Sequence, residues 1–176
     1  MAATVVVKQA TGSGPTLTTI TNLRLKTADD PSGTDTTYPL VRPSAGSNYS
    51  YVVWLLLSAS TTPAGTINNV KFYTDGTLFT DSSGAGALRV KGITTASYTQ
   101  AAGTPGSSGT LSASVYTSGA DWNGWTSGSP LSVSGSLTNP STGTISDYVA
   151  LQAIVTTDQE IKTETAETLT WRYDET

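Results

Sequence analysis

The sequence contains no cysteine and no histidine. Without cysteine, the protein can form no disulfide and has no thiolate metal ligand or thiol nucleophile. Without histidine, a Ser–His–Asp triad, the commonest zinc sites and the most common general base near neutral pH are excluded as well. Any catalysis would therefore depend on carboxylates or on activated Ser, Thr, Lys or Tyr side chains.

Positive charge and long apolar runs are also scarce. Nine Lys and Arg stand against 13 Asp and Glu, and the basic residues are scattered, whereas nucleic-acid binding generally needs a basic face. The longest apolar run, residues 51–57, has seven residues, and a membrane-spanning helix needs about twenty. Residues 1–10 have neither a basic region nor a long apolar region, so we expect no secretory signal peptide. The sequence thus predicts neither nucleic-acid nor membrane binding.

The most frequent residues are polar and β-branched. The chain has 33 Thr and 22 Ser, but only one Met, four Glu and five Lys among the strong helix formers. Thr favours the pleated, half-buried surface of a sheet because its branched side chain restricts χ1. This composition indicates an all-β protein with long polar turns.

Alternation of apolar and polar residues predicts about nine or ten strands. Segments 48–60 and 146–158 are apolar on both faces and are predicted to be central strands. A change of parity between Ile67 and Val70 predicts a β-bulge at Asn68 and Asn69. Residues 110–125 fit either a strand or one short helix. The other predicted strands are residues 3–10, 17–29, 66–74, 87–93, 96–103, 130–137 and 166–175.

The predicted strands are separated by Gly-, Ser- and Pro-rich turns rather than by helical patterns, which excludes βαβ units. We therefore expect an all-β fold, in which two antiparallel sheets form a β-sandwich of the jelly-roll or immunoglobulin-like kind. Residues 1–176 are expected to form a single domain. Residues 1–15 have two alternatives: they form an N-terminal arm that pairs with another subunit, or they pack into the chain's own sheet.

Two tryptophans lie three residues apart in the segment SGADWNGWTSGSP, residues 118–130. Trp122 and Trp125 are surrounded by Gly, Ser, Thr, Asn and Asp, so the chain uses two large apolar rings in a polar loop. Three uses remain open: to fix the loop to the core, to contact another subunit, or to stack on a sugar ring.

A Pro-broken loop over residues 29–43 carries three carboxylates, Asp29, Asp30 and Asp35. Their oxygens are suitable Ca²⁺ ligands, but the spacing does not match an EF-hand, and Asp is also an ordinary turn former. We expect a solvated turn, with no catalytic residue, metal or cofactor in the chain. The candidate partner-binding residues are Trp122, Trp125, Asp29, Asp30, Tyr38 and Arg42.

Four segments, TNLRLKTAD, INNVKFYTDGT, SPLSVSGSLTNPSTGTISDYVALQ and ETLTWRYDET, resemble parts of small uncharacterised β-sandwich proteins encoded among the structural genes of tailed bacteriophages. The resemblance extends from about Ile20 to the C-terminus and carries no catalytic signature. It implies a non-enzymatic virion protein that is assembled in the host cytoplasm.

The first role that this resemblance implies is that of a head decoration (cement) protein, which binds the major capsid protein. The expected partners also include other virion proteins and further copies of the chain. The alternatives are a tail component, or a carbohydrate- or receptor-binding β-sandwich module. In each case loops on a rigid scaffold would supply the contacts.

Overall fold

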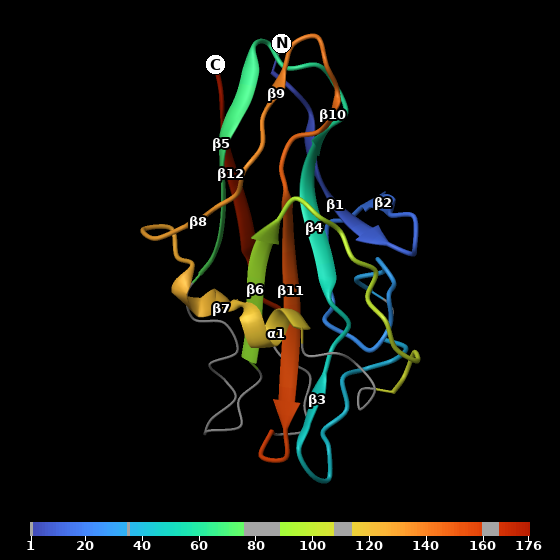
Figure 1. Ribbon diagram of the computed structural model, residues 1–176. Coiled ribbons are helices and arrows are strands. Elements are labelled where there is room, and N and C mark those ends of the chain that lie inside the picture. The colour runs from blue at the N-terminus through green and yellow to red at the C-terminus, as the bar shows by residue number, and fades with distance from the viewer. Residues whose placement is uncertain (1, 35, 76–88, 108–113, 160–165) are drawn as a thin grey trace.

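The computed structural model describes residues 2–34, 36–75, 89–107, 114–159 and 166–176. Within them, two antiparallel sheets pack face to face (Figure 1), so the predicted all-β sandwich is confirmed. Helical structure in these ranges is limited to α1 (Ser114–Ser118) and the 3₁₀ helix η2 (Trp122–Gly124). Neither of them is long and apolar enough to span a membrane.

The larger sheet has the strand order β2-β1-β4-β11-β6-β7, with β3 paired to β11 and β10 paired to β4. Because β1 lies between β2 and β4, residues 5–11 belong to the chain's own sheet and do not form a free arm. The bounds of these strands are β1 Val5–Thr11, β2 Thr16–Thr19, β3 Ser47–Tyr49, β4 Val53–Ala59, β6 Arg89–Thr95, β7 Ala120–Asp121, β10 Gly143–Thr144 and β11 Tyr148–Thr156.

The smaller sheet has β5 (Thr66–Thr74) between β12 (Leu169–Glu175) and β8 (Leu131–Ser132), and β9 (Leu137–Thr138) pairs with the start of β5. The register between β5 and β12 shifts by one residue opposite the step from Arg172 to Asp174. Asn69 has φ 50 at this point. The predicted bulge at Asn68 and Asn69 is therefore confirmed, and Asn fits it because its short polar side chain tolerates the left-handed region.

The main core lies between the two sheets. β4 contributes Val53, Leu55 and Leu57, and β5 contributes Ile67, Val70 and Phe72, all of them buried. The opposite face of β4 and β11 packs a second cluster that includes Trp54 and Ala150. The two predicted central strands are thus buried on both faces, as their apolar character indicated.

The predicted strand over residues 17–29 is wrong, because only Thr16–Thr19 forms a strand there. Leu17 packs in the second cluster, whereas Leu23 and Leu25 pack against the main core. Ile20, whose N–H still bonds to the carbonyl of Val7, already packs against the main core. The regular alternation over residues 17–29 therefore comes from residues that pack in two different cores.

Other predicted strands are shorter than expected. Residues 48–60 divide into β3 and β4, because the Tyr51 N–H leaves the ladder to bond to the Lys26 carbonyl. Residues 130–137 divide around Gly135, which has φ 125 and packs against the Ile145 carbonyl. Residues 96–103 form no strand, and residues 110–125 contain the short helix α1. The described residues therefore hold twelve strands, several of them only two residues long, rather than nine or ten.

Candidate functional site

Trp122 and Trp125 lie in the main core, where they are 3% and 7% exposed. The short η2 turn directs both rings inward: the Asp121 carboxylate accepts from the Asn123 N–H at 2.9 Å, and the Trp125 N–H donates to the Trp122 carbonyl at 3.0 Å. The Trp125 ring packs edge-on against Phe72, with 6.0 Å between ring centroids. The two rings therefore close one side of the sandwich.

Thr74, at the end of β5, fixes the same turn to the smaller sheet. Its N–H donates to the Trp125 carbonyl at 2.7 Å, and its hydroxyl lies 3.2 Å from the carbonyls of both tryptophans. A sugar or a partner protein needs an exposed ring face, and these rings offer none. The structure thus corrects the assignment of Trp122 and Trp125 as partner-binding residues and supports the loop-fixing alternative.

Asp29 bonds to the turn between β1 and β2, and Asp30 bonds to donors of its own loop. The Asp29 carboxylate accepts from the Gly12 N–H at 2.8 Å. The Asp30 carboxylate accepts from the Ser32 N–H at 2.9 Å and pairs with the Lys26 ammonium at 2.5 Å. The Lys26 side chain is only 4% exposed, so the ion pair compensates a buried charge.

These contacts give both carboxylates a structural role, and their predicted role in partner binding stays a prediction. Asp35, the third carboxylate of the Ca²⁺ alternative, lies outside the described residues. Within the described ranges, no group of three or more His, Cys, Asp and Glu residues is placed to hold a metal ion.

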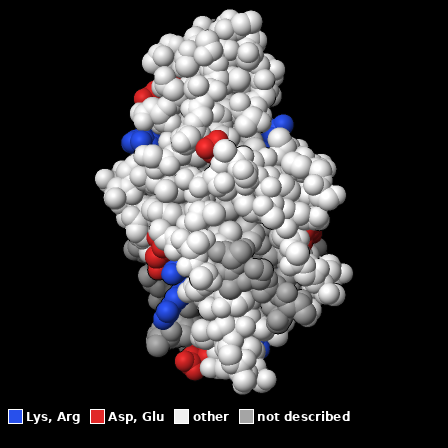
Figure 2. Space-filling view, in the orientation of Figure 1, with Lys and Arg blue, Asp and Glu red and all other residues white. Residues whose placement is uncertain are grey.

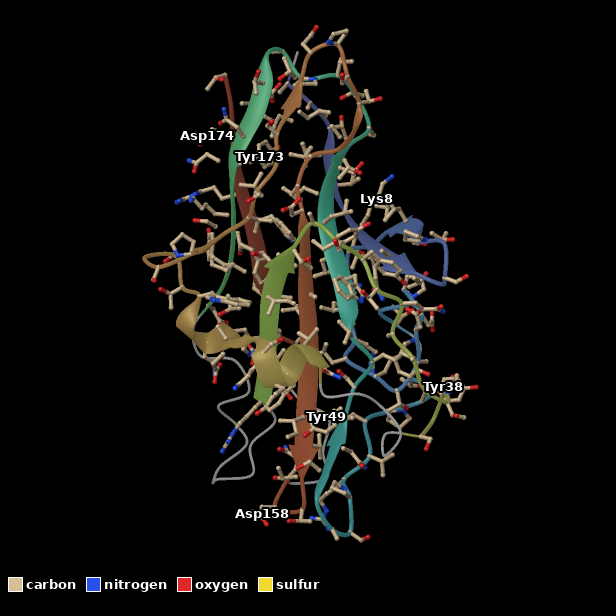
Figure 3. All side chains as sticks on the ribbon, in the orientation of Figure 1. Lys8, Tyr38, Tyr49, Asp158, Tyr173 and Asp174 are labelled. Atoms are coloured by element: carbon tan, nitrogen blue, oxygen red, sulfur yellow. The ribbon has the colours of Figure 1, made fainter. Side chains whose placement is uncertain are left out.

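Tyr38 and Val41 are the exposed large hydrophobic side chains of the described chain, at 42% and 52% exposure. Both belong to residues 36–46, which we name the Tyr38 loop. Figure 3 shows Tyr38 at the lower right margin of the molecule, away from the sheets. Tyr38 has φ 59, an uncommon conformation for a bulky residue. The ring therefore projects from a backbone that other contacts must hold in place.

Those contacts come from four separate segments. The Tyr38 carbonyl accepts from the N–H and hydroxyl of Thr27 at 2.9 and 3.0 Å. The Val41 carbonyl accepts from the Asn48 amide at 2.7 Å, and the Arg42 guanidinium donates to the Gln159 carbonyl at 3.1 Å. The Tyr38 ring also lies so close to Gly106 that a Cβ there would be 3.1 Å from it. The Tyr38 loop is accordingly fixed in one shape, in which Leu40 packs against the main core while Tyr38 and Val41 are exposed.

Burial raises the pKa of the three tyrosines Tyr51, Tyr98 and Tyr148, of which Tyr98 and Tyr148 pack in the second cluster. Burial, with Asp29 and Tyr148 nearby, raises the pKa of Tyr98 to about 12, and its hydroxyl donates to the Gly12 carbonyl at 2.8 Å. Burial also raises the pKa of Tyr148, and burial with Asp29 raises that of Tyr51. The raised pKa keeps these three phenols protonated at neutral pH.

A shallow hollow lies between residues 19–22 and 31–34 and has a volume of about 210 Å³. Small-molecule sites usually occupy about 300–1,000 Å³ and are mostly apolar. This hollow is smaller, and its lining consists mainly of Thr, Ser and Asn with no charged side chain. It offers neither the enclosure nor the convergent charges of a catalytic or ligand pocket.

The molecular surface has few charges. Among the described residues, Figure 2 shows small, separate spots of Lys, Arg, Asp and Glu, with no broad patch of one sign in this view. Long-range electrostatic attraction of a charged partner depends on such patches. Contacts made by this face would therefore depend on shape, hydrogen bonds and the few exposed apolar groups.

Comparison of the chain with protein-family models, with curated proteins and with solved structures finds no match.

Proposed function

We propose that the protein is a non-enzymatic structural component of a tailed-phage particle, and that it docks on a neighbouring virion protein through the Tyr38 loop. The observation that carries this proposal is the exposed Tyr38 ring at a backbone φ of 59, next to the exposed Val41. Backbone held in such a region costs about 1–3 kcal/mol, persists where surrounding contacts fix it, and is found often at functional sites. The phage assignment depends on the resemblance of four sequence segments to phage structural proteins.

Docking through this loop is favourable for two physical reasons. Tyr and Arg are the residues that most often dominate protein interfaces, and the loop presents Tyr38 with Arg42 four residues away. The bonds from Thr27 and Asn48 hold the backbone in one conformation before binding. Less conformational entropy is then lost on association, so a small interface binds more tightly.

A capsid decoration protein bound to the major capsid protein fits these properties better than the alternatives. Each copy would make a small contact, and many copies on a repeating lattice would act together through their high local concentration. A tail component with the same docking loop is the second form of this proposal. The carbohydrate-binding alternative loses its main support, because the two tryptophans that suggested it are buried.

The test is the incorporation of loop variants into particles of the phage that encodes the chain. The double variant Tyr38→Ser and Val41→Ser should reduce the copies per particle, measured by quantitative mass spectrometry. Loss of a central interface residue costs about 2 kcal/mol or more, which is about thirtyfold in affinity for each contact.

A matched control is Thr62→Ala, which changes an exposed residue in the turn between β4 and β5. This turn lies at the other end of the molecule from Tyr38 (Figures 1 and 3). The control should leave incorporation unchanged. The proposal fails if the wild-type chain is absent from purified particles, or if the folded double variant is incorporated as well as the wild type.

A further inference from the structure

In the described part of the chain, β12 lies at the edge of the smaller sheet and pairs on one side. Among the described residues, β5 is the strand that bonds to it, and no other backbone group of those residues does so. A seven-residue edge strand with unpaired N–H and C=O groups can pair with a strand from another chain. β12 also contains no proline, which is one common protection against such pairing.

The bonds of Thr176 show which backbone groups of β12 point outward. Thr176 and Thr66 exchange both N–H···O=C bonds, and these groups alternate sides along a strand. Thr170, Arg172 and Asp174 therefore bond toward β5. The outward N–H and C=O groups belong to the residues between and around them, which are Leu169, Trp171, Tyr173 and Glu175.

The charges on β12 are arranged so that two copies of the strand complement each other. Arg172 and Asp174 are both exposed and lie on either side of Tyr173. If two antiparallel copies pair with Tyr173 opposite Tyr173, each Arg172 lies opposite an Asp174 of the other copy. These two pairs fall at positions without backbone bonds, where opposing side chains approach most closely.

Neighbouring registers lack this complementarity. A two-fold axis at Arg172 places the two guanidinium groups opposite each other, and an axis at Asp174 places the two carboxylates opposite each other. Like charges directly opposite are destabilising. An axis at Trp171 places Arg172 opposite Thr170 and forms no ion pair.

We propose that two copies of the chain pair through antiparallel β12 strands, with Tyr173 on the two-fold axis and reciprocal Arg172–Asp174 ion pairs. The smaller sheets of the two copies then form one continuous sheet. This inference depends on the edge of β12 and not on the Tyr38 loop, so it holds or fails independently of the proposed function.

Charge exchange tests the interface and its register together. The wild-type chain should form a dimer in analytical ultracentrifugation in the micromolar range. Arg172→Asp replaces two attractive pairs with two repulsive ones and should raise the dimer dissociation constant by at least about tenfold. The variant Arg172→Asp with Asp174→Arg restores both pairs in reversed order and should restore the dimer. Circular dichroism should show an unchanged fold, because both side chains are exposed.

A single cysteine reports the register directly, since the chain has none of its own. Tyr173→Cys should give an oxidised covalent dimer, because opposed Cα atoms at a hydrogen-bonded pair lie about 5.5 Å apart, within disulfide range. Thr170→Cys is the matched control and should not cross-link, because it faces Thr176 of the other copy. A wild type that stays monomeric, a dimer unaffected by Arg172→Asp, or equal cross-linking at both positions would each overturn the proposal.

Discussion

At the scale of single residues, the structure answers what two tryptophans do in a polar loop. Trp122 and Trp125 fill the gap between the sheets, and the bonds from Thr74 and the short η2 turn hold them there. Buried aromatic rings remove about 150–250 Å² each from water. The loop therefore belongs to the core of the molecule rather than to its binding surface.

The substitution Trp125→Ala should lower the free energy of unfolding by about 3–5 kcal/mol, because it removes a core ring and leaves a cavity. Urea unfolding followed by circular dichroism measures this change. Thr62→Ala, at an exposed position, should change stability by less than about 0.5 kcal/mol. A Trp125→Ala protein as stable as the wild type, but deficient in particle binding, would show that the ring serves a partner after all.

The sequence identifies the unusual residues but not the direction in which they point. Trp122 and Trp125 lie in a Gly- and Ser-rich loop. No alternation of apolar and polar residues in this loop indicates which side chains face the core. The roles of Asp29 and Asp30 depend on Gly12 and Lys26, and the contact between Gly12 and Asp29 joins residues 17 positions apart. Tyr38 was found from the sequence as a candidate, but its exposure and its φ of 59 come only from the fold.

At the scale of secondary-structure elements, the alternation of apolar and polar residues predicts a strand well where all the apolar residues on one face of the segment pack in the same core. β5, β11 and β12 match their predicted ranges closely, and even the bulge in β5 could be predicted from a change of parity. The prediction fails at residues 17–29, because Leu17 and Leu23 belong to different cores. The periodicity of apolar residues indicates which residues are buried, but it does not indicate in which of the two cores each residue is buried.

The bulge itself should be sensitive to the residue at position 69. Asn69→Ala should destabilise the protein by about 1–2 kcal/mol, because Ala lacks the short polar side chain that lets Asn tolerate the left-handed region. Asn69→Gly tolerates φ 50 and should be clearly less destabilising, although both variants lose the bond from the Asn69 amide to the Asp174 carboxylate. Thermal unfolding compares the two, and equal losses would mean that the backbone conformation is not the limiting feature.

At the scale of the whole molecule, the sandwich holds two candidate contact surfaces apart. Figure 3 shows Tyr38 near the lower right of the molecule, and Tyr173 and Asp174 near the upper left. A dimer formed through β12 would carry two Tyr38 loops, so that both could bind one lattice and gain in avidity if their spacing fits it. Composition predicts the all-β class, and alternation with the turns between strands predicts the two-layered scaffold. The identity of a partner depends on surface details that neither encodes.

The most direct test of the central claim is a cryo-electron microscopy map of the particle whose genome encodes this chain. We expect density for a two-sheet sandwich on the particle, with residues 36–46 against a neighbouring virion protein and Tyr38 buried in that contact. Particles that lack this density, or a bound sandwich whose Tyr38 loop faces solvent, would contradict the central claim.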